Sequence, residues 1–217
     1  MPTISHITEK IVSSRPLLQE AIIEDIVSFG SVAEKIKPDI EKELGKEAKL
    51  SAIVMALRRI AENLSARSPK KRFDYSSEIS MKTNICDIGI IKTHAFFSKM
   101  KSIYSIVDYE QGDALNIIQG NNEVSIIANE RYFDKIKKAL AGEKIIRQEK
   151  SLVIVSLNFP KEYVSEPGVI ATITRKLAWN GVNLIEIILT FKELNCVINK
   201  KDATKAYNAL QELIEGS

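Results

Sequence analysis

The chain has 217 residues, of which 45% are hydrophobic and 27% are charged, and its formal net charge is +3. These values are typical of a soluble globular protein with room for two or three small domains. The sequence has neither an apolar run of about 18 residues nor a basic start followed by an apolar stretch, so we expect no membrane span, no signal peptide and a cytoplasmic protein.

The first segment has the pattern of consecutive helices. Ser14 is a candidate cap for a helix whose first position is Pro16. Ser28 is a second candidate N-cap, because the valines before and after it have the spacing of a hydrophobic staple. Pro38 is expected to begin another short helix, which Gly45 ends.

Apolar residues then recur at helical spacing from Leu50 to Leu64, which predicts the longest helix of a helical domain over residues 1–68. Short helices, a glycine turn and a longer amphipathic helix are similar to a helix-turn-helix domain, in which this helix would be the recognition helix. A plain helical bundle used for dimerisation fits the same pattern.

Basic residues cluster on and after this helix, although the helical domain as a whole has equal numbers of basic and acidic residues. A dedicated DNA-binding domain usually has a basic surplus, whereas a basic arm beside a recognition helix suits phosphate contacts. DNA binding therefore stays open, and residues 69–77 are a basic, solvated linker in either case. The candidate DNA contacts are Arg58, Arg59, Arg67, Lys70, Lys71 and Arg72.

The middle segment, residues 78–150, has the order strand, helix, strands, helix. A strand over 79–85 leads through Asp87-Ile88-Gly89-Ile90 to a helix over 93–103. The later elements are predicted as strands over 104–109, 114–118 and 124–128, a hairpin turn at 120–122, a helix over 131–140 and a final strand over 144–148.

The last segment, residues 151–217, repeats this βαββα order more clearly. Alternating β-formers over 152–159 predict a strand, and Pro167-Gly168 opens an amphipathic helix that Asn180-Gly181 closes. Two strands and a helix over 202–214 follow. The chain order leaves this unit without a strand after its second helix, and an open sheet edge tends to be covered.

Several residues of the last segment resemble an ACT domain, the small-molecule-sensing module in the regulatory half of aspartokinases. The matching residues are Pro167-Gly168-Val169, Leu177, Asn180-Gly181, Val182-Asn183-Leu184, Asp202-Ala203, Ala206 and Leu210. The middle segment resembles the module more weakly, with Asp87 and Gly89 standing where Glu166 and Gly168 stand later, but without the proline. The resemblance implies an α+β fold with a helical domain followed by two ferredoxin-like ACT modules.

The turn before the helix at 169 is the candidate ligand site. The free N–H groups of Gly168 to Ile170 suit a carboxylate, Glu166 suits an ammonium group, and the amide of Asn183 would come from a facing subunit. An amino acid fits this description, although Pro167-Gly168 could equally be a turn and nothing more. The full candidate set is Ser165, Glu166, Pro167, Gly168, Val169, Ile170, Asn183 and Leu184, with Asp87 and Gly89 in the first module.

Catalytic signatures are missing from the sequence, including the P-loop, the nucleophile elbow and paired metal-binding cysteines. Cys86 and Cys196 lie in apolar, strand-like sequence and are expected to be buried free thiols, so we expect no metal and no cofactor. The helical and sensing modules leave no room for a kinase domain. Two hypotheses remain for a non-enzymatic homodimer: a ligand-responsive transcriptional regulator, or a free-standing regulatory subunit of an amino-acid biosynthetic enzyme.

Overall fold

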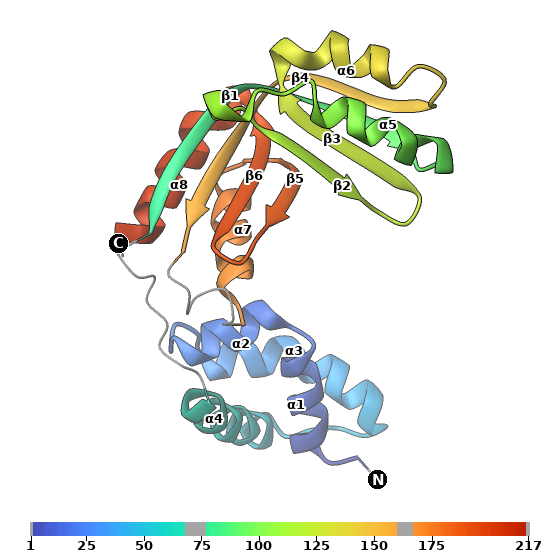
Figure 1. Ribbon diagram of the computed structural model, residues 1–217. Helices are drawn as coiled ribbons and strands as arrows, with labels where there is room; N and C mark the ends of the chain where they lie inside the picture. Colours follow the sequence, from blue (N-terminus) through green and yellow to red (C-terminus); the bar gives the residue numbers. More distant parts are fainter. Residues whose placement is uncertain (1, 68–76, 160–166, 216–217) are drawn as a thin grey trace. The chain divides into compact units, whose positions relative to one another are not determined.

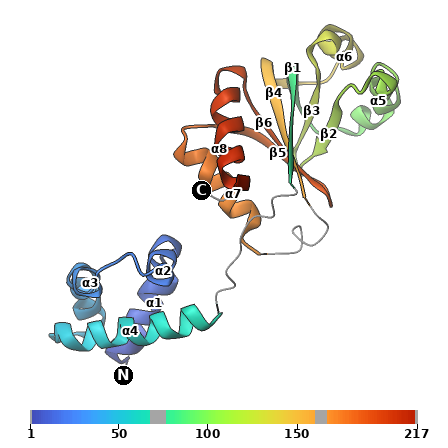
Figure 2. The same ribbon diagram turned by 90° about the vertical axis from the view of Figure 1, so that its left-hand side faces the viewer.

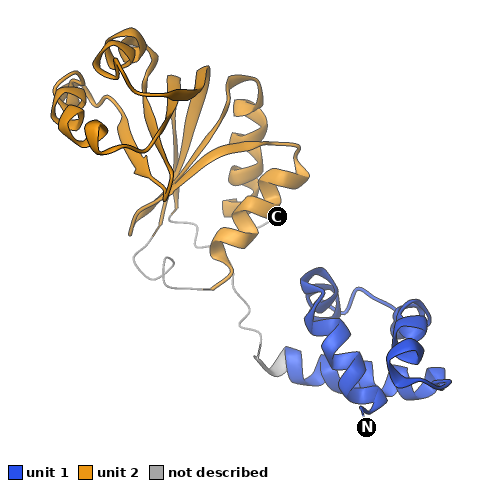
Figure 3. Cartoon of the chain, turned by 90° about the vertical axis from the view of Figure 1, so that its right-hand side faces the viewer, with its two compact units in different colours: residues 1–71 blue, residues 72–217 orange. Residues whose placement is uncertain are grey.

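The computed structural model describes residues 2–67, 77–159 and 167–215, with side chains described only to residue 64 in the first range. The chain divides into two compact units, a helical unit over 1–71 and a C-terminal unit over 72–217 (Figure 3). The apolar core of the helical unit is separate from the three apolar clusters of the C-terminal unit. The two units are therefore described one at a time.

The helical unit has four helices: α1 (Ile4–Ser13), α2 (Pro16–Ile23), α3 (Phe29–Leu44) and α4 (Leu50–Arg67). The side chain of Ser28 caps α3 as predicted, by accepting a hydrogen bond from the amide of Ser31. Gly45 ends α3 with a left-handed φ of 71°, as expected for a glycine cap. The long helix α4 packs against the other three, with Ile53 and Leu57 fully buried.

Two details of the predicted helices are wrong. Ser14 ends α1, where its hydroxyl donates to the carbonyl of Ile11, and α2 begins after Arg15 without a side-chain cap. Pro38 lies inside α3 and does not begin a helix of its own. Ile36 and Ile40 on either side of it are buried in the helical core, so packing holds α3 continuous despite the hydrogen bond that proline removes.

The C-terminal unit is built on one antiparallel sheet of six strands in the order β2-β3-β1-β4-β6-β5 (Figure 1). Within the described residues, this unit also has four helices and three short 3-10 turns. The elements are β1 (Glu78–Ile91), α5 (His94–Tyr104), β2 (Leu115–Gln119), β3 (Glu123–Asn129), α6 (Phe133–Ala139), β4 (Ile145–Asn158), α7 (Val169–Trp179), β5 (Leu184–Leu189), β6 (Glu193–Asn199) and α8 (Ala203–Glu215), with 3-10 turns at Tyr109–Gln111, Glu130–Tyr132 and Lys200–Asp202.

The two central strands, β1 and β4, are each 14 residues long and run through both halves of the sheet. One half, called the first lobe, contains β2, β3, α5 and α6 with Ile85–Ile91 of β1 and the start of β4. The other half, called the second lobe, contains β5, β6, α7 and α8 with the end of β4. Residues Glu78–Lys82 of β1 pair with the end of β4, so they cover the edge that the sequence order leaves open in the second lobe. The expected boundary between residues 150 and 151 falls inside β4.

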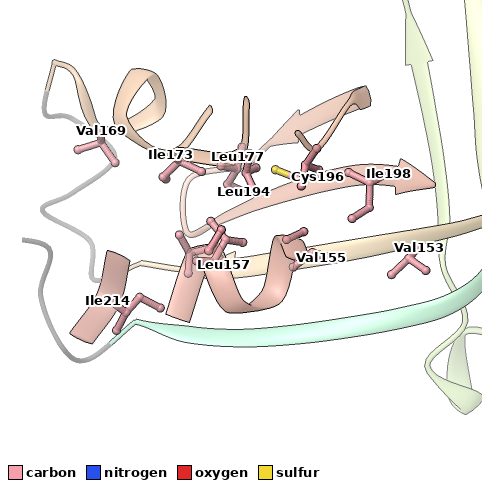
Figure 4. Packing of buried hydrophobic residues seen from close by; sticks show 14 of the residues in the cluster. Val153, Val155, Leu157, Val169, Ile173, Leu177, Leu194, Cys196, Ile198 and Ile214 are labelled. Atoms are coloured by element: carbon pink, nitrogen blue, oxygen red, sulfur yellow. The ribbon is translucent and has the colours of Figure 1, made fainter. Parts of the chain in front are cut away.

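Each lobe has its own apolar core between the sheet and its two helices. In the second lobe, Val155 and Leu157 of β4 and Cys196 of β6 pack against Ile173 and Leu177 of α7 (Figure 4). In the first lobe, Phe96 of α5 and Ile136 of α6 pack on alternate residues of β1 and β3. The sheet curls between the lobes, so that α5 and α6 lie on one side and α7 and α8 on the other, with the strands between (Figure 2).

The sheet face opposite the helices is called the inner face, and it carries a fourth apolar cluster. Ile85, Ile127, Leu152, Ile154 and Val197 belong to this cluster. Asn84 and Ser151, both with a φ of 56°, lie where β1 and β4 pass from one lobe to the other. An irregular residue reverses the alternation of side chains along a strand, which lets both halves of each long strand turn their apolar side toward the helices.

Two predicted elements of the middle segment are wrong. Asp87 and Gly89 lie within β1 and not in a loop before a helix, because the apolar residues around them are buried on both sides of the sheet and continue the strand. The strand predicted over 104–109 is the end of α5 and a turn. There the carboxylate of Asp108 accepts a hydrogen bond from the amide of Glu110, and this local bond competes with an extended backbone.

A partly buried ion pair links α5 to the loop after α6. The carboxylate of Glu143, 2% exposed, accepts hydrogen bonds from Thr93 Oγ1 and Lys99 Nζ, each at 2.7 Å. The Lys99 ammonium, and next the Thr93 hydroxyl, hold the pKa of Glu143 below its ordinary value of 4.5. The folded-state pKa is thus the lower one, so the carboxylate stabilises the fold above about pH 4.5 and this contribution is lost as the pH falls through the folded-state pKa.

We therefore expect Glu143→Gln to lower the free energy of unfolding at pH 7 by about 1.5–3 kcal/mol, the range for hydrogen bonds to charged groups. Urea titration at pH 7 and at pH 3 measures the effect, and the difference from the parent should shrink at the lower pH. Glu110→Gln, at an exposed site, is the control and should have almost no effect. An equal loss at both pH values would show that the Glu143 charge is not responsible.

Candidate functional site

The start of α7 is a helix N-terminus at the edge of the described residues. Gly168 is the N-cap residue, with φ 95° and ψ −17°, and no described side chain caps the helix. The first intrahelical bond is donated by the amide of Thr172 to the carbonyl of Gly168, at 2.9 Å. The preceding amides are the ones that a helix leaves without an internal acceptor, at the positive end of its dipole. A Cβ built on Gly168 meets no described atom within 4 Å, so no described residue fills the space beside this backbone.

The other residues predicted around this turn differ in their exposure to solvent. Pro167 is exposed, whereas Val169 is buried and Ile170 is half-buried, and both of these pack into the core of the second lobe. Only the backbone amides of Val169 and Ile170 are therefore available to a ligand. Ser165 and Glu166 lie outside the described residues.

Asn183 and Leu184 lie at the opposite end of α7, at the start of β5. They line a shallow cavity of about 570 Å³ together with the exposed side of α7. The helix has 11 residues and so measures roughly 16 Å, which separates Asn183 from Gly168 within one chain. The fold therefore leaves these two predicted contacts apart in a single copy.

Asp87 and Gly89 lie on the inner face, in a polar cluster that the sequence analysis did not identify. Asp87 is fully buried, and its carboxylate accepts a hydrogen bond from Ser125 Oγ at 2.7 Å and pairs with Arg147 Nη2 at 2.7 Å. Arg147 also lies 3.8 Å from Glu186 of β5. A lone acidic residue within the apolar run of β1 was the sequence signal for this cluster, but its partners come from three other strands.

The two cysteines are buried and free, as predicted. Burial raises the pKa of the Cys86 thiol to about 11 and that of Cys196 to about 12. Both thiols are thus protonated at neutral pH and unsuited to nucleophilic or redox chemistry. Within residues 2–67, 77–159 and 167–215, no group of three or more histidine, cysteine or acidic side chains could hold a metal ion.

Only two of the six basic candidates, Arg58 and Arg59, have described side chains. Arg58 and Arg59 are both exposed on α4, but they lie beside different hollows: Arg58 shares one with Asp25 and Glu62, and Arg59 shares the other with Glu9. The side chain of Arg67, and Lys70, Lys71 and Arg72 as a whole, lie outside the described residues. The described part of the chain contains no helix that is both long and apolar enough to cross a membrane.

Comparison with solved structures finds the same fold in several aspartate kinase chains. The ligand-free regulatory subunit of aspartate kinase from Thermus thermophilus is 19% identical, with a TM-score of 0.52 over 62% of this chain and 95% of that chain. Aspartate kinase from Clostridium acetobutylicum is 17% identical, with a TM-score of 0.53 over 67% of this chain and 36% of that chain. Aspartate kinase from Synechocystis is 14% identical, with a TM-score of 0.54 over 85% of this chain and 38% of that chain.

Comparison with curated proteins gives no match. The family model described as an ACT domain matches residues 148–212, which span most of β4, α7, β5, β6 and most of α8. This match covers the second lobe and includes Gly168 and Asn183. The C-terminal unit therefore contains an ACT domain at residues 148–212, within a fold that is also found in aspartate kinase regulatory subunits.

Proposed function

We propose that the protein is a non-catalytic regulatory protein that binds an amino acid through its ACT domain. The observation that carries this proposal is the start of α7 at Gly168, which no described side chain caps, within the segment that matches the ACT family. The likeness to the Thermus thermophilus regulatory subunit of aspartate kinase supports it, because that protein is a separate regulatory chain of similar fold.

In the proposed complex, the amides of Gly168 to Ile170 hold the ligand carboxylate, since helix N-termini bind anions. Glu166 is the proposed partner of the ligand ammonium group. Asn183 lies at the other end of α7, so its amide reaches this ligand only from a second copy of the chain. Ligand binding and homodimer formation are then coupled.

A thermal-shift screen of the amino acids on the full chain tests this function. Saturation at one hundred times the dissociation constant stabilises a protein by about 2.7 kcal/mol. For a unit of this size, that corresponds to an increase in Tm of roughly 5–10 °C. We expect at least one amino acid to give such an increase and to shift sedimentation toward the dimer, and a screen with no increase would contradict the proposal.

The helical unit is proposed to transmit the effect of ligand binding by docking onto a biosynthetic enzyme. Its exposed apolar side chains include Leu17, Ile26 and Met55, which are 60%, 76% and 50% exposed. Its charged residues are mixed in sign, and some of them form ion pairs, as in Lys10 with Glu43 and Arg15 with Asp39. A surface of mixed charge with exposed apolar side chains suits a protein partner better than a nucleic acid.

DNA binding is the second candidate, and the exposure of Arg58 and Arg59 on α4 favours it. If it is correct, replacing Lys70, Lys71 and Arg72 by alanine should weaken binding on all sequences alike and flatten the salt dependence by about one unit per lost phosphate contact. Gel shifts at low salt, with and without each amino acid, measure this.

The matched control for that experiment is the triple alanine variant of Lys135, Lys137 and Lys138, which removes the same charge from the exposed side of α6. An equal effect of both triple variants would indicate non-specific attraction to DNA. If the parent protein shifts no promoter DNA under any condition, regulation of an enzyme remains as the proposed function.

A further inference from the structure

The turn after α2 holds an apolar side chain at the surface of the helical unit. Asp25 has a left-handed φ of 54°, and its amide donates to the carbonyl of Ile22 at 3.2 Å. The amide of Ile26 donates to the carbonyl of Ala21 at 3.1 Å. These two bonds form the Schellman motif, in which the apolar residue at the place of Ile26 often packs back onto its own helix. Ile26 is instead 76% exposed, so the motif fixes its backbone without burying its side chain.

A shallow cavity of about 470 Å³ lies beside this turn, between the end of α2, the start of α3 and α4. Asp25 lines the cavity and directly precedes Ile26, whereas Ile26 itself does not line it. An exposed apolar side chain and a hollow therefore lie next to each other, and we call them together the α2–α4 surface. The residues that line the hollow are Ile22, Ile23, Asp25, Phe29, Arg58, Ala61 and Glu62.

The charges on the α2–α4 surface complement a copy of the same surface. Arg58 and Glu62 lie four residues apart on one side of α4, with the small side chain of Ala61 between them. Neither Arg58 nor Glu62 forms an ion pair with any described residue. A basic residue before an acidic one is also the less favourable order for a pair within one helix. Across a twofold axis α4 lies antiparallel to its copy, which brings each Arg58 opposite the Glu62 of the other copy.

We propose that the α2–α4 surface binds a second copy of this chain, with Ile26 of each copy in the hollow of the other and Arg58 of each copy paired with Glu62 of the other. The contact is isologous, because the same patch is used on both copies. The turn at Asp25 holds the backbone of Ile26 in place before association, which lowers the entropy cost of binding.

This contact is separate from the ACT domain and does not rest on the function proposed for the start of α7. It is formed by α2, the start of α3 and α4 of the helical unit. Leu17 and Met55 do not line the hollow, so this pairing leaves them to the enzyme that the helical unit is proposed to bind.

Sedimentation of the full chain over a range of concentrations, without added amino acid, measures the contact. We expect a concentration-dependent dimer, and Ile26→Asp should raise its dissociation constant at least tenfold because a carboxylate would enter the apolar hollow. Leu17→Asp is the matched control, since Leu17 is 60% exposed on the same helix and lies outside the hollow, and it should change the dissociation constant less than about twofold. A monomer at every concentration, or a dimer that Ile26→Asp leaves unchanged, would overturn the proposal.

Charge exchange between two variants tests the predicted pairs. Arg58→Glu alone and Glu62→Arg alone each bring like charges together across the axis, so each should self-associate at least fivefold more weakly than the parent. In a mixture of the two variants opposite charges meet again at both contacts. Fluorescence-detected sedimentation with one variant labelled should therefore show a mixed dimer nearly as strong as that of the parent.

Mixed association no stronger than self-association would show that Arg58 and Glu62 do not meet between copies, and would contradict the proposed contact. Gly168→Ala should leave the dimer formed without amino acid unchanged. A loss in that variant would place the contact in the ACT domain instead.

Discussion

Replacement of Phe96 by alanine is expected to lower the free energy of unfolding of the C-terminal unit by about 3–5 kcal/mol. Phe96 is fully buried between α5 and the sheet, in the core of the first lobe. The loss combines the hydrophobic transfer of the ring with the cavity that remains, and it is a large part of the stability of an ordinary domain. Urea denaturation of the full chain, followed by circular dichroism, measures it.

The neighbouring residue provides the control for this prediction. Phe97 is 46% exposed on the same helix, and its ring lies 6.1 Å from that of Phe96. Phe97→Ala should therefore cost less than about 1 kcal/mol, since a half-exposed ring loses less apolar contact. Similar losses for the two variants would show that α5 packs with a different face than the one described.

The second large effect is expected at Gly168. Gly168→Ala places a methyl group beside the amides that are proposed to hold the ligand carboxylate, in space that no described residue fills, and we expect at least a tenfold loss of amino-acid affinity by calorimetry. The fold itself also loses about 1–2 kcal/mol, because a φ of 95° is strained for any residue with a side chain.

Gly181 is the matched control for that strain. It has a φ of 69°, also has nothing within 4 Å of a built Cβ, and lies after the opposite end of α7. Gly181→Ala should therefore lose similar stability while it keeps ligand affinity. If both variants bind the screened amino acid like the parent protein, the ligand site lies elsewhere and Pro167-Gly168 is only a turn.

Most of the helices and strands were predicted correctly, because residues close together in the sequence determine them. The apolar period of Leu50 to Leu64 gives α4, and the hairpin signal at 120–122 joins β2 to β3. Pro38 misled the prediction because tertiary packing of Ile36 and Ile40 outweighs the local cost of proline in a helix. Such packing is not visible in a short window of sequence.

Long-range pairing accounts for what the sequence could not predict. The strands β1 and β4 pass through both lobes, and a search for repeated units places a boundary inside β4. The inner-face cluster was missed for the same reason, because Asp87, Ser125, Arg147 and Glu186 come from four strands that only the sheet order brings together. The turn at Gly168 was found because its proline, glycine and helix start are consecutive in the chain.

Amide NMR titration of the full chain with the amino acid that gives the largest thermal shift tests the central claim most directly. The account predicts saturable shifts centred on the amides of Gly168, Val169 and Ile170, with smaller shifts at Asn183 as the dimer forms. Shifts confined to other parts of the chain, or no shift with any amino acid, would contradict an amino-acid site at the start of α7.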